Sequence, residues 1–225
     1  MGGNIASTEV VELIKTDSTP SFGQLPVERI DAIGTMFGDA PILCGGYDNS
    51  ALDSCISFQN SQWIQSHSMN SKRKDLGGVQ INSTTFWLLG GRYYDIYKGW
   101  VILDSTEFII EGQANGAPGP KLPHGMDSMC VVKLSEAEIF VIGGSGGDNH
   151  WNEVWIYDPQ NGFTRNQGPS MNKQRHGHSC SIMRDGDKTV IVVAGGVDGK
   201  LEPIEIYDPT DNMWHLGINK FPNNH

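Results

Sequence analysis

Pairs of adjacent glycines recur along the chain, and each pair but the first follows a short apolar run. A second apolar strand follows every pair, and the last residues of these strands lie 47, 51, 48 and 50 residues apart. They are Val11, Phe58, Ile109, Tyr157 and Tyr207. A steady period of this length indicates one supersecondary unit repeated through the whole chain. The pairs are Gly2-Gly3, Gly45-Gly46, Gly90-Gly91, Gly143-Gly144 and Gly195-Gly196.

Aromatic and polar residues occupy fixed places in this unit. In three units an aromatic opens the strand after the second one, and these residues are Trp63, Phe163 and Trp214. Ser-Met-Asn then precedes Arg73 in one unit and Arg175 in another. Leu-Pro stands at the same place elsewhere, as at Pro26 and Pro123. Each unit therefore predicts four short strands separated by turns.

The repeat resembles the kelch family, whose period is about 50 residues. The resemblance covers nearly the whole chain and is most complete from Arg175 to His178, whereas Val11 and Ile109 replace the expected tyrosine in the first and third units. It implies an all-β, kelch-type β-propeller in a single domain, with about five four-stranded blades. The expected blades span residues 1–25, 26–69, 70–122, 123–171 and 172–220, and the first is incomplete.

The repeated residues have structural roles in such a fold. Radially packed blades bury both faces of each sheet, the glycine pair ends the second strand where a side chain would obstruct the turn, and Phe58, Trp63, Tyr157, Tyr207 and Trp214 fill space between blades. A closed ring needs its first and last blades joined. We therefore expect a fragment of a ring with six or more blades; a five-bladed ring with an incomplete first blade is the alternative.

Charge and hydropathy narrow the range of partners. With 16 basic and 26 acidic residues the formal net charge is −10, which disfavours nucleic acid and anionic membrane surfaces. The longest apolar stretch, 189–194, is too short to span a bilayer and predicts a buried strand. The residues from Met1 to Asn4 do not begin a signal peptide. We expect a protein partner, with neither nucleic acid binding nor membrane insertion.

Motifs that carry chemistry are incomplete. The loop 143–147 lacks the spacing of a dinucleotide-binding motif, and 177–181 lacks the second glycine of a nucleophile elbow. His176 and His178 are expected to alternate on one strand and to hydrogen-bond neighbouring turns, because no third metal ligand has a suitable spacing. Galactose oxidase has kelch-like blades, but no pattern here corresponds to its copper site. We expect no catalytic residue, cofactor or metal, and no enzyme activity.

The four cysteines and one sequon bear on the compartment. Cys44 and Cys55 lie on adjacent antiparallel strands and are expected to form a disulfide, whereas Cys130 and Cys180 are interpreted as small buried hydrophobes at equivalent positions. Asn82 begins the glycosylation sequon Asn-Ser-Thr in a turn between strands. These features favour an extracellular location, and a cytoplasmic protein with reduced cysteines is the alternative.

The longest loop after a glycine pair, from Arg92 to Trp100, is the predicted binding region. Aromatic residues and arginine dominate the energetics of protein interfaces, although rings in such a loop can also pack back onto the blade. The candidate residues are Arg92, Tyr93, Tyr94, Tyr97 and Trp100, together with His150 and Trp151. We expect a non-catalytic protein-interaction module, and the resemblance implies a substrate-recognition adaptor. The alternative is an extracellular propeller with a galactose-oxidase-like or carbohydrate-binding role.

Overall fold

The computed structural model describes residues 8–10, 24–165, 169–196 and 203–217. These residues form antiparallel β-sheets and no helix, so the all-β prediction is confirmed for them. Among the described residues there is accordingly no helix long and apolar enough to cross a membrane. The chain divides into two compact units, Met1–Lys121 and Leu122–His225. The first glycine pair, Gly2-Gly3, and Val11 lie outside the described residues.

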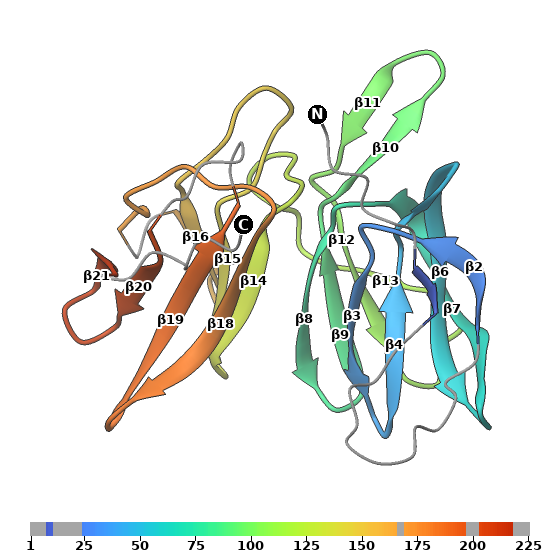
Figure 1. Ribbon diagram of the computed structural model, residues 1–225, viewed down its shortest axis with the longest axis horizontal. Helices are drawn as coiled ribbons and strands as arrows, with labels where there is room; N and C mark the ends of the chain where they lie inside the picture. Colours follow the sequence, from blue (N-terminus) through green and yellow to red (C-terminus); the bar gives the residue numbers. More distant parts are fainter. Residues whose placement is uncertain (1–7, 11–23, 166–168, 197–202, 218–225) are drawn as a thin grey trace, which may run out of the picture. The chain divides into compact units, whose positions relative to one another are not determined.

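Unit 1 contains two complete sheets, each a meander whose neighbouring strands are antiparallel (Figure 1). The first consists of β3 (Ile33–Phe37), β4 (Ala40–Cys44), β6 (Ser50–Gln59) and β7 (Gln62–Arg73), with β5 (Tyr47–Asp48) also paired to β6. The second consists of β8 (Gly77–Asn82), β9 (Thr85–Leu89), β12 (Thr106–Ile110) and β13 (Ala117–Pro118). Between β9 and β12 the chain forms a separate hairpin, β10 (Arg92–Asp95) and β11 (Gly99–Ile102). A further pair joins β1 (Thr8–Val10) to β2 (Gln24–Arg29).

Unit 2 repeats the same meander twice. One sheet contains β14 (Cys130–Ser135), β15 (Glu138–Ile142), β16 (Val154–Asp158) and β17 (Gly162–Arg165). The other contains β18 (His178–Asp185), β19 (Lys188–Gly195), β20 (Glu205–Asp208) and β21 (Met213–Leu216). The core of this unit is apolar, with Phe140, Ile156, Ile191 and Trp214 among its buried residues. Both sheets contribute to this core, as expected for strands that bury both faces.

The glycine pairs end the second strand of each sheet in a left-handed backbone conformation. At Gly143 and Gly144 φ is 58° and 105°, values that residues with a Cβ rarely adopt. A Cβ on Gly143 would lie 2.6 Å from the carbonyl oxygen of Arg175, and the Gly144 amide donates to that oxygen at 2.7 Å. Gly45 and Gly46 make the same contacts with Arg73. Each of these two pairs thus contacts the backbone that leads into the following sheet, where a side chain would be excluded.

Two expectations about local structure are wrong. Cys130 and Cys180 are not separate buried hydrophobes, because the structure joins them in a disulfide between β14 and β18, with Cα atoms 5.9 Å apart. These two strands belong to different sheets, and their cysteine side chains face each other between the sheets within bonding distance. His176 and His178 do not alternate on one strand, since Gly177 between them has φ 62° and β18 begins only at His178.

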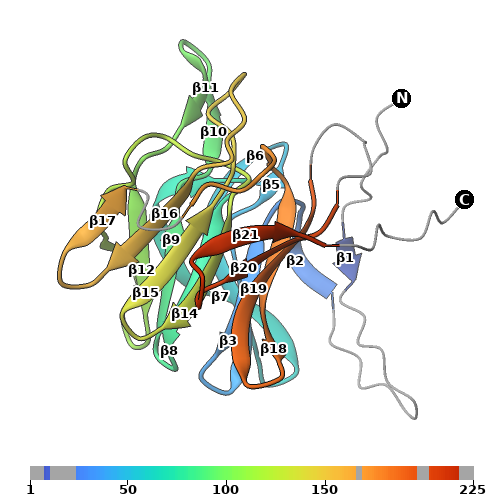
Figure 2. The ribbon, with the colours of Figure 1, turned by 90° about the vertical axis from the view of Figure 1, so that its left-hand side faces the viewer.

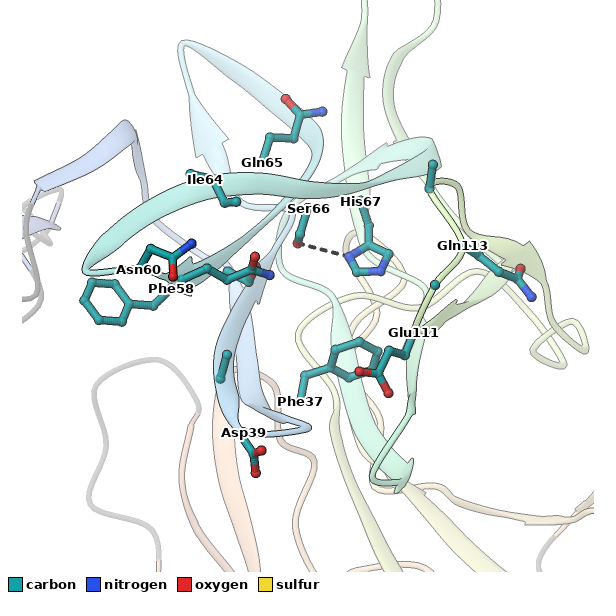
Figure 3. Close-up of a pocket in the computed structure, with 15 residues that line it drawn as sticks. Phe37, Asp39, Phe58, Asn60, Ile64, Gln65, Ser66, His67, Glu111 and Gln113 are labelled. Atoms are coloured by element: carbon teal, nitrogen blue, oxygen red, sulfur yellow. Dashed lines mark hydrogen bonds between the residues drawn. The ribbon is translucent and has the colours of Figure 1, made fainter.

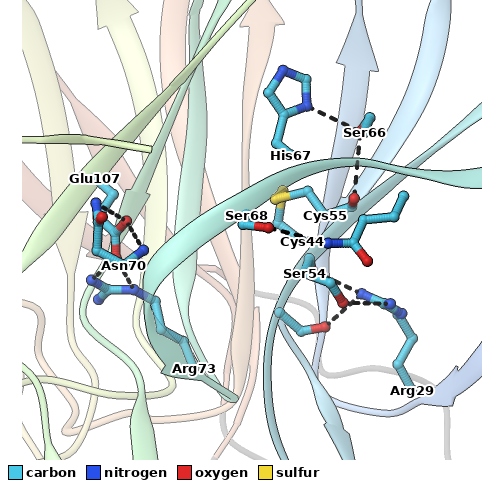
Figure 4. The surroundings of a disulfide bond; sticks show 12 residues. Arg29, Cys44, Ser54, Cys55, Ser66, His67, Ser68, Asn70, Arg73 and Glu107 are labelled. Carbon is cyan, nitrogen blue, oxygen red and sulfur yellow. Dashed lines mark hydrogen bonds and ion pairs between the residues drawn. A yellow bond between two sulfur atoms is a disulfide. The ribbon is translucent and has the colours of Figure 1, made fainter. Parts of the chain in front are cut away.

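The other cysteine pair is confirmed. Cys44 and Cys55 are directly opposite each other on β4 and β6 and form a buried disulfide with a Cα separation of 4.0 Å. Figure 4 shows the surroundings of this bond. The sheets also differ in places from the expected blades, because β7 continues to Arg73, past residue 69.

Candidate functional site

The hairpin β10–β11 is the region of the structure with the most exposed large apolar side chains. Figures 1 and 2 show it projecting from unit 1 at the end opposite the turn between β8 and β9. Tyr94 pairs with Trp100 and Asp95 with Gly99 across the hairpin. The Asp95 carboxylate accepts the backbone amides of Tyr97 and Lys98 at 2.9 and 3.0 Å, which fixes the turn.

The tip of this hairpin presents its rings to solvent. Exposure is 90% for Tyr97, 78% for Ile96, 60% for Tyr94 and 49% for Trp100. Tyr94 and Trp100 contact each other edge to face, with ring centroids 5.6 Å apart. Tyr93 is only partly exposed. Ile96 was not among the predicted residues, although its position between Tyr94 and Tyr97 is a signal for it. We define Tyr94, Ile96, Tyr97 and Trp100 as the hairpin tip.

Charged residues hold the base of the hairpin. The Arg92 side chain donates to Asp75 at 2.9 Å and lies 4.9 Å from the centre of the Trp100 ring. The backbones of Lys74 and Arg92 exchange two hydrogen bonds of 3.0 and 2.9 Å. The Lys74 ammonium pairs with Asp31 at 2.7 Å and lies over the ring of Tyr47. These contacts tie the hairpin to the rest of unit 1, so its tip is displayed from an ordered base.

The second predicted loop, which carries His150 and Trp151, is folded back. Trp151 is partly buried and packs against Gly146 and the ring of His124, whose centroid lies 4.4 Å away. The ring of His150 contacts the ring of His176 in a tilted arrangement, with centroids 3.9 Å apart. Both predicted residues therefore contribute to packing within unit 2, in contrast to the hairpin tip.

A polar pocket of about 820 Å³ opens elsewhere on unit 1 (Figure 3). Its walls combine the rings of Phe37 and Phe58 with amides and carboxylates, and no lysine or arginine lines it. His67 contacts Phe37 edge to face, with centroids 5.7 Å apart, and its Nδ1 lies 3.0 Å from the Ser66 hydroxyl. Burial lowers the pKa of His67, so its imidazole is neutral at physiological pH. Sequence reasoning did not identify this pocket, because its walls come from three separate segments.

Sequence reasoning also missed a buried polar network in the third repeat, the one that corresponds to the expected blade 70–122. The Glu107 carboxylate receives Arg73 at 2.7 Å, the Asn70 backbone amide at 2.6 Å and the Ser71 amide at 3.1 Å. Figure 4 shows Glu107, Asn70 and Arg73 close together and joined by dashed lines. Arg73 also donates to the carbonyl oxygen of Gly90, the first glycine of the pair. This network fastens the segment from Asn70 to Arg73, which leads into β8, to the end of β9 and to β12.

The fifth repeat has the same network. Glu205 receives the backbone amides of Asn172 and Lys173 at 2.6 and 3.2 Å and Arg175 at 3.1 Å, and Arg175 donates to Gly195. The spacing of Asn, Arg and Glu in the two repeats is the signal that could have found it. The arginine and glutamate side chains of both networks are buried and hydrogen-bonded, so they serve the fold.

The described residues show no arrangement that indicates metal chemistry. Within them no group of three or more His, Cys, Asp or Glu side chains could hold a metal ion. Burial and the neighbouring charge of Arg175 lower the pKa of His178 to about 4, so this histidine is neutral near pH 7.

Comparison with known proteins adds no assignment, since no family model and no curated protein matches the chain.

Proposed function

We propose that this chain is part of a kelch-type β-propeller and acts as a non-catalytic protein-interaction module that binds its partner through the β10–β11 hairpin. The propeller proposal is supported by four successive antiparallel meanders with a period near 50 residues. Glycine pairs in the left-handed conformation end the second strand of each.

The binding proposal rests on one observation, the exposure of the hairpin tip. Tyrosine and tryptophan with a neighbouring arginine are the residues that contribute most to protein interfaces. The aromatic residues of the tip are between 49% and 90% exposed. Covering them with a partner would remove this apolar surface from water, which favours binding. Their ordered base reduces the entropy lost on binding. The two disulfides favour an extracellular partner, since disulfides persist in oxidising compartments.

Affinity capture with paired variants tests this proposal. The wild-type chain, a Tyr97→Ala/Trp100→Ala variant and a Val27→Ala/Met36→Ala control are each used to capture extracellular proteins from the tissue that expresses the chain. Val27 and Met36 are exposed apolar residues of the same unit and lie outside both the hairpin and the lining of the pocket described above. We expect a protein that is retained by wild type and control and lost with the hairpin variant. Equal retention by all three would overturn the assignment to the hairpin.

Carbohydrate binding at the pocket is a second candidate. The lining favours it, because aromatic faces pack against sugar rings while the side chains of Asp39, Gln65, Glu111 and Gln113 can hydrogen-bond hydroxyl groups. Screening against immobilised glycans, with Phe37→Ala as the disabled variant, tests it. Binding by the wild type that Phe37→Ala abolishes and Tyr97→Ala/Trp100→Ala leaves intact would favour the pocket over the hairpin.

A further inference from the structure

The turn between β8 and β9 is built on a glycosylation sequon. Asn82 is the last residue of β8, Ser83 and Thr84 form the turn, and all three side chains are exposed. No other Asn-x-Ser/Thr sequence with x other than proline occurs in the 225 residues. The sequon therefore lies where a large, hydrated substituent meets no packed surface.

Hydrogen bonds within the turn orient the acceptor side chain. The backbone amide and the hydroxyl of Thr84 both donate to Oδ1 of Asn82, each at 3.0 Å. Neither bond uses the Asn82 Nδ2 atom, which is the atom that forms the bond to a sugar. The threonine that the sequon requires is thus already in contact with the amide that would react, a geometry that an exposed asparagine in an irregular loop would not provide.

The disulfides independently support the compartment in which this modification takes place. Cys44–Cys55 and Cys130–Cys180 involve all four cysteines, and no described cysteine is free. Full pairing of cysteines is typical of proteins that fold in the secretory pathway, where asparagine is glycosylated.

We propose that Asn82 carries an N-linked glycan. In the transfer, Nδ2 of Asn82 bonds to C1 of a sugar supplied by a lipid-linked oligosaccharide pyrophosphate. The bond between C1 and the phosphate oxygen breaks, the lipid pyrophosphate leaves with the electron pair, and the amide loses one proton to a base of the transferase. No electrons are exchanged with any other reactant.

The position of this glycan is compatible with the proposed binding hairpin. The Ser83 carbonyl accepts the Gly38 amide at 2.9 Å, and the Thr84 carbonyl accepts the Glu111 amide at 2.9 Å. These bonds fix the turn at the end of unit 1 opposite β10–β11, as both ribbon views show. A glycan at Asn82 would extend from that end and leave the hairpin tip accessible to a protein.

Mass spectrometry of the full chain tests the proposal. The chain is expressed with a secretory leader in mammalian cells, and the tryptic peptide that contains Asn82 is analysed before and after treatment with peptide-N-glycosidase. We expect a glycosylated peptide whose Asn82 becomes aspartate on enzymatic release. Asn82→Gln and Thr84→Ala each remove the glycan, whereas Ser83→Ala is the matched control and keeps it because the middle position of the sequon is not read.

The wild-type peptide decides the outcome even if a variant fails to fold. An unmodified Asn82 in the secreted protein, or a glycan attached elsewhere, would overturn the proposal. Loss of the glycan in Ser83→Ala would also contradict it, since the sequon chemistry would then not explain the modification.

Discussion

The third and fourth repeats have the same strand order but solve the same packing problem with opposite chemistry. In the third, Arg73 and Glu107 form a buried ion pair, and Glu107 also accepts the backbone amide of Asn70. The register of the strands places Pro123, Met126 and Trp155 at the equivalent positions of the fourth. Met126 and Trp155 are buried there. The ion pair of the third repeat is thus replaced by two buried apolar residues in the fourth repeat.

The residue at the asparagine position explains why the glutamate is replaced together with it. The Asn70 backbone amide needs an acceptor and receives one from Glu107, whereas proline at position 123 has no N–H to satisfy. The second repeat has proline and an apolar residue at these positions, Pro26 and Ile56, but it keeps a buried arginine, Arg29, which donates to carbonyl oxygens. Asparagine with glutamate, or proline with an apolar residue, are two self-consistent sets. The comparison teaches that the glutamate accompanies the asparagine, whose backbone N–H it accepts, whereas a buried arginine at this place can also be held by carbonyl oxygens.

Removing the carboxylate should have the largest effect. Glu107→Ala leaves the Arg73 guanidinium buried without its counter-ion and two backbone amides without an acceptor. We expect a loss of about 3–5 kcal/mol in the free energy of unfolding. Urea denaturation followed by tryptophan fluorescence measures it.

A control and a rescue variant sharpen this test. Glu136→Ala removes a carboxylate that pairs with Lys133 but is 93% exposed, and the expected change is within about 0.5 kcal/mol. The triple change Asn70→Pro, Arg73→Met and Glu107→Trp copies the fourth repeat and should recover much of the lost stability. If Glu107→Ala is as mild as Glu136→Ala, the buried network contributes little and the comparison fails.

The fifth repeat adds a pH dependence that the third lacks, because His178 replaces Leu76 at the equivalent position. The pKa of His178 is about 4 in the folded chain and near 6.5 when unfolded. As the pH falls from 6.5 towards 4, the unfolded chain takes up a proton that the folded chain does not. Stability is therefore lost in this window, by about 3 kcal/mol at its lower end.

The variant His178→Leu, which copies the third repeat, isolates this effect. The free energy of unfolding is measured by urea denaturation at pH 6.5 and pH 4.5 for wild type and variant. We expect the wild type to lose more stability between the two pH values than the variant, because carboxylate titrations are common to both. Parallel losses would contradict a depressed pKa at His178.

The sequence predicts the repeat and its strands, but not the buried network and the second disulfide that connect distant parts of the chain. The period, the glycine pairs and the Cys44–Cys55 bond follow from local spacing and pairing between adjacent strands. Glu107 is separated from Asn70 by 37 residues, so its role follows only when equivalent positions of all repeats are compared. The Cys130–Cys180 bond does not follow from pairing between adjacent strands, because it joins two sheets and its cysteines are 50 residues apart in the sequence.

The predicted binding loops show a second limit, which concerns exposure. Trp100 and Trp151 both follow a glycine pair and both are accompanied by other aromatic or basic residues. Pairing of β10 with β11 lifts Trp100 away from the sheet, whereas Trp151 returns to Gly146 and His124. Composition cannot distinguish these outcomes, because both loops contain rings that are equally suited to packing and to binding.

The two tryptophans provide the smallest and last test of the comparison between these repeats. Trp151→Ala removes a partly buried ring and should cost about 2 kcal/mol of unfolding free energy. Trp100→Ala removes a half-exposed ring whose contacts with Arg92 and Tyr94 are worth about 0.5–1 kcal/mol. The same urea experiment measures both variants. A cost for Trp100→Ala equal to that for Trp151→Ala would mean that the hairpin ring is needed for folding, and a loss of partner binding in Trp100 variants could then no longer be assigned to direct contact.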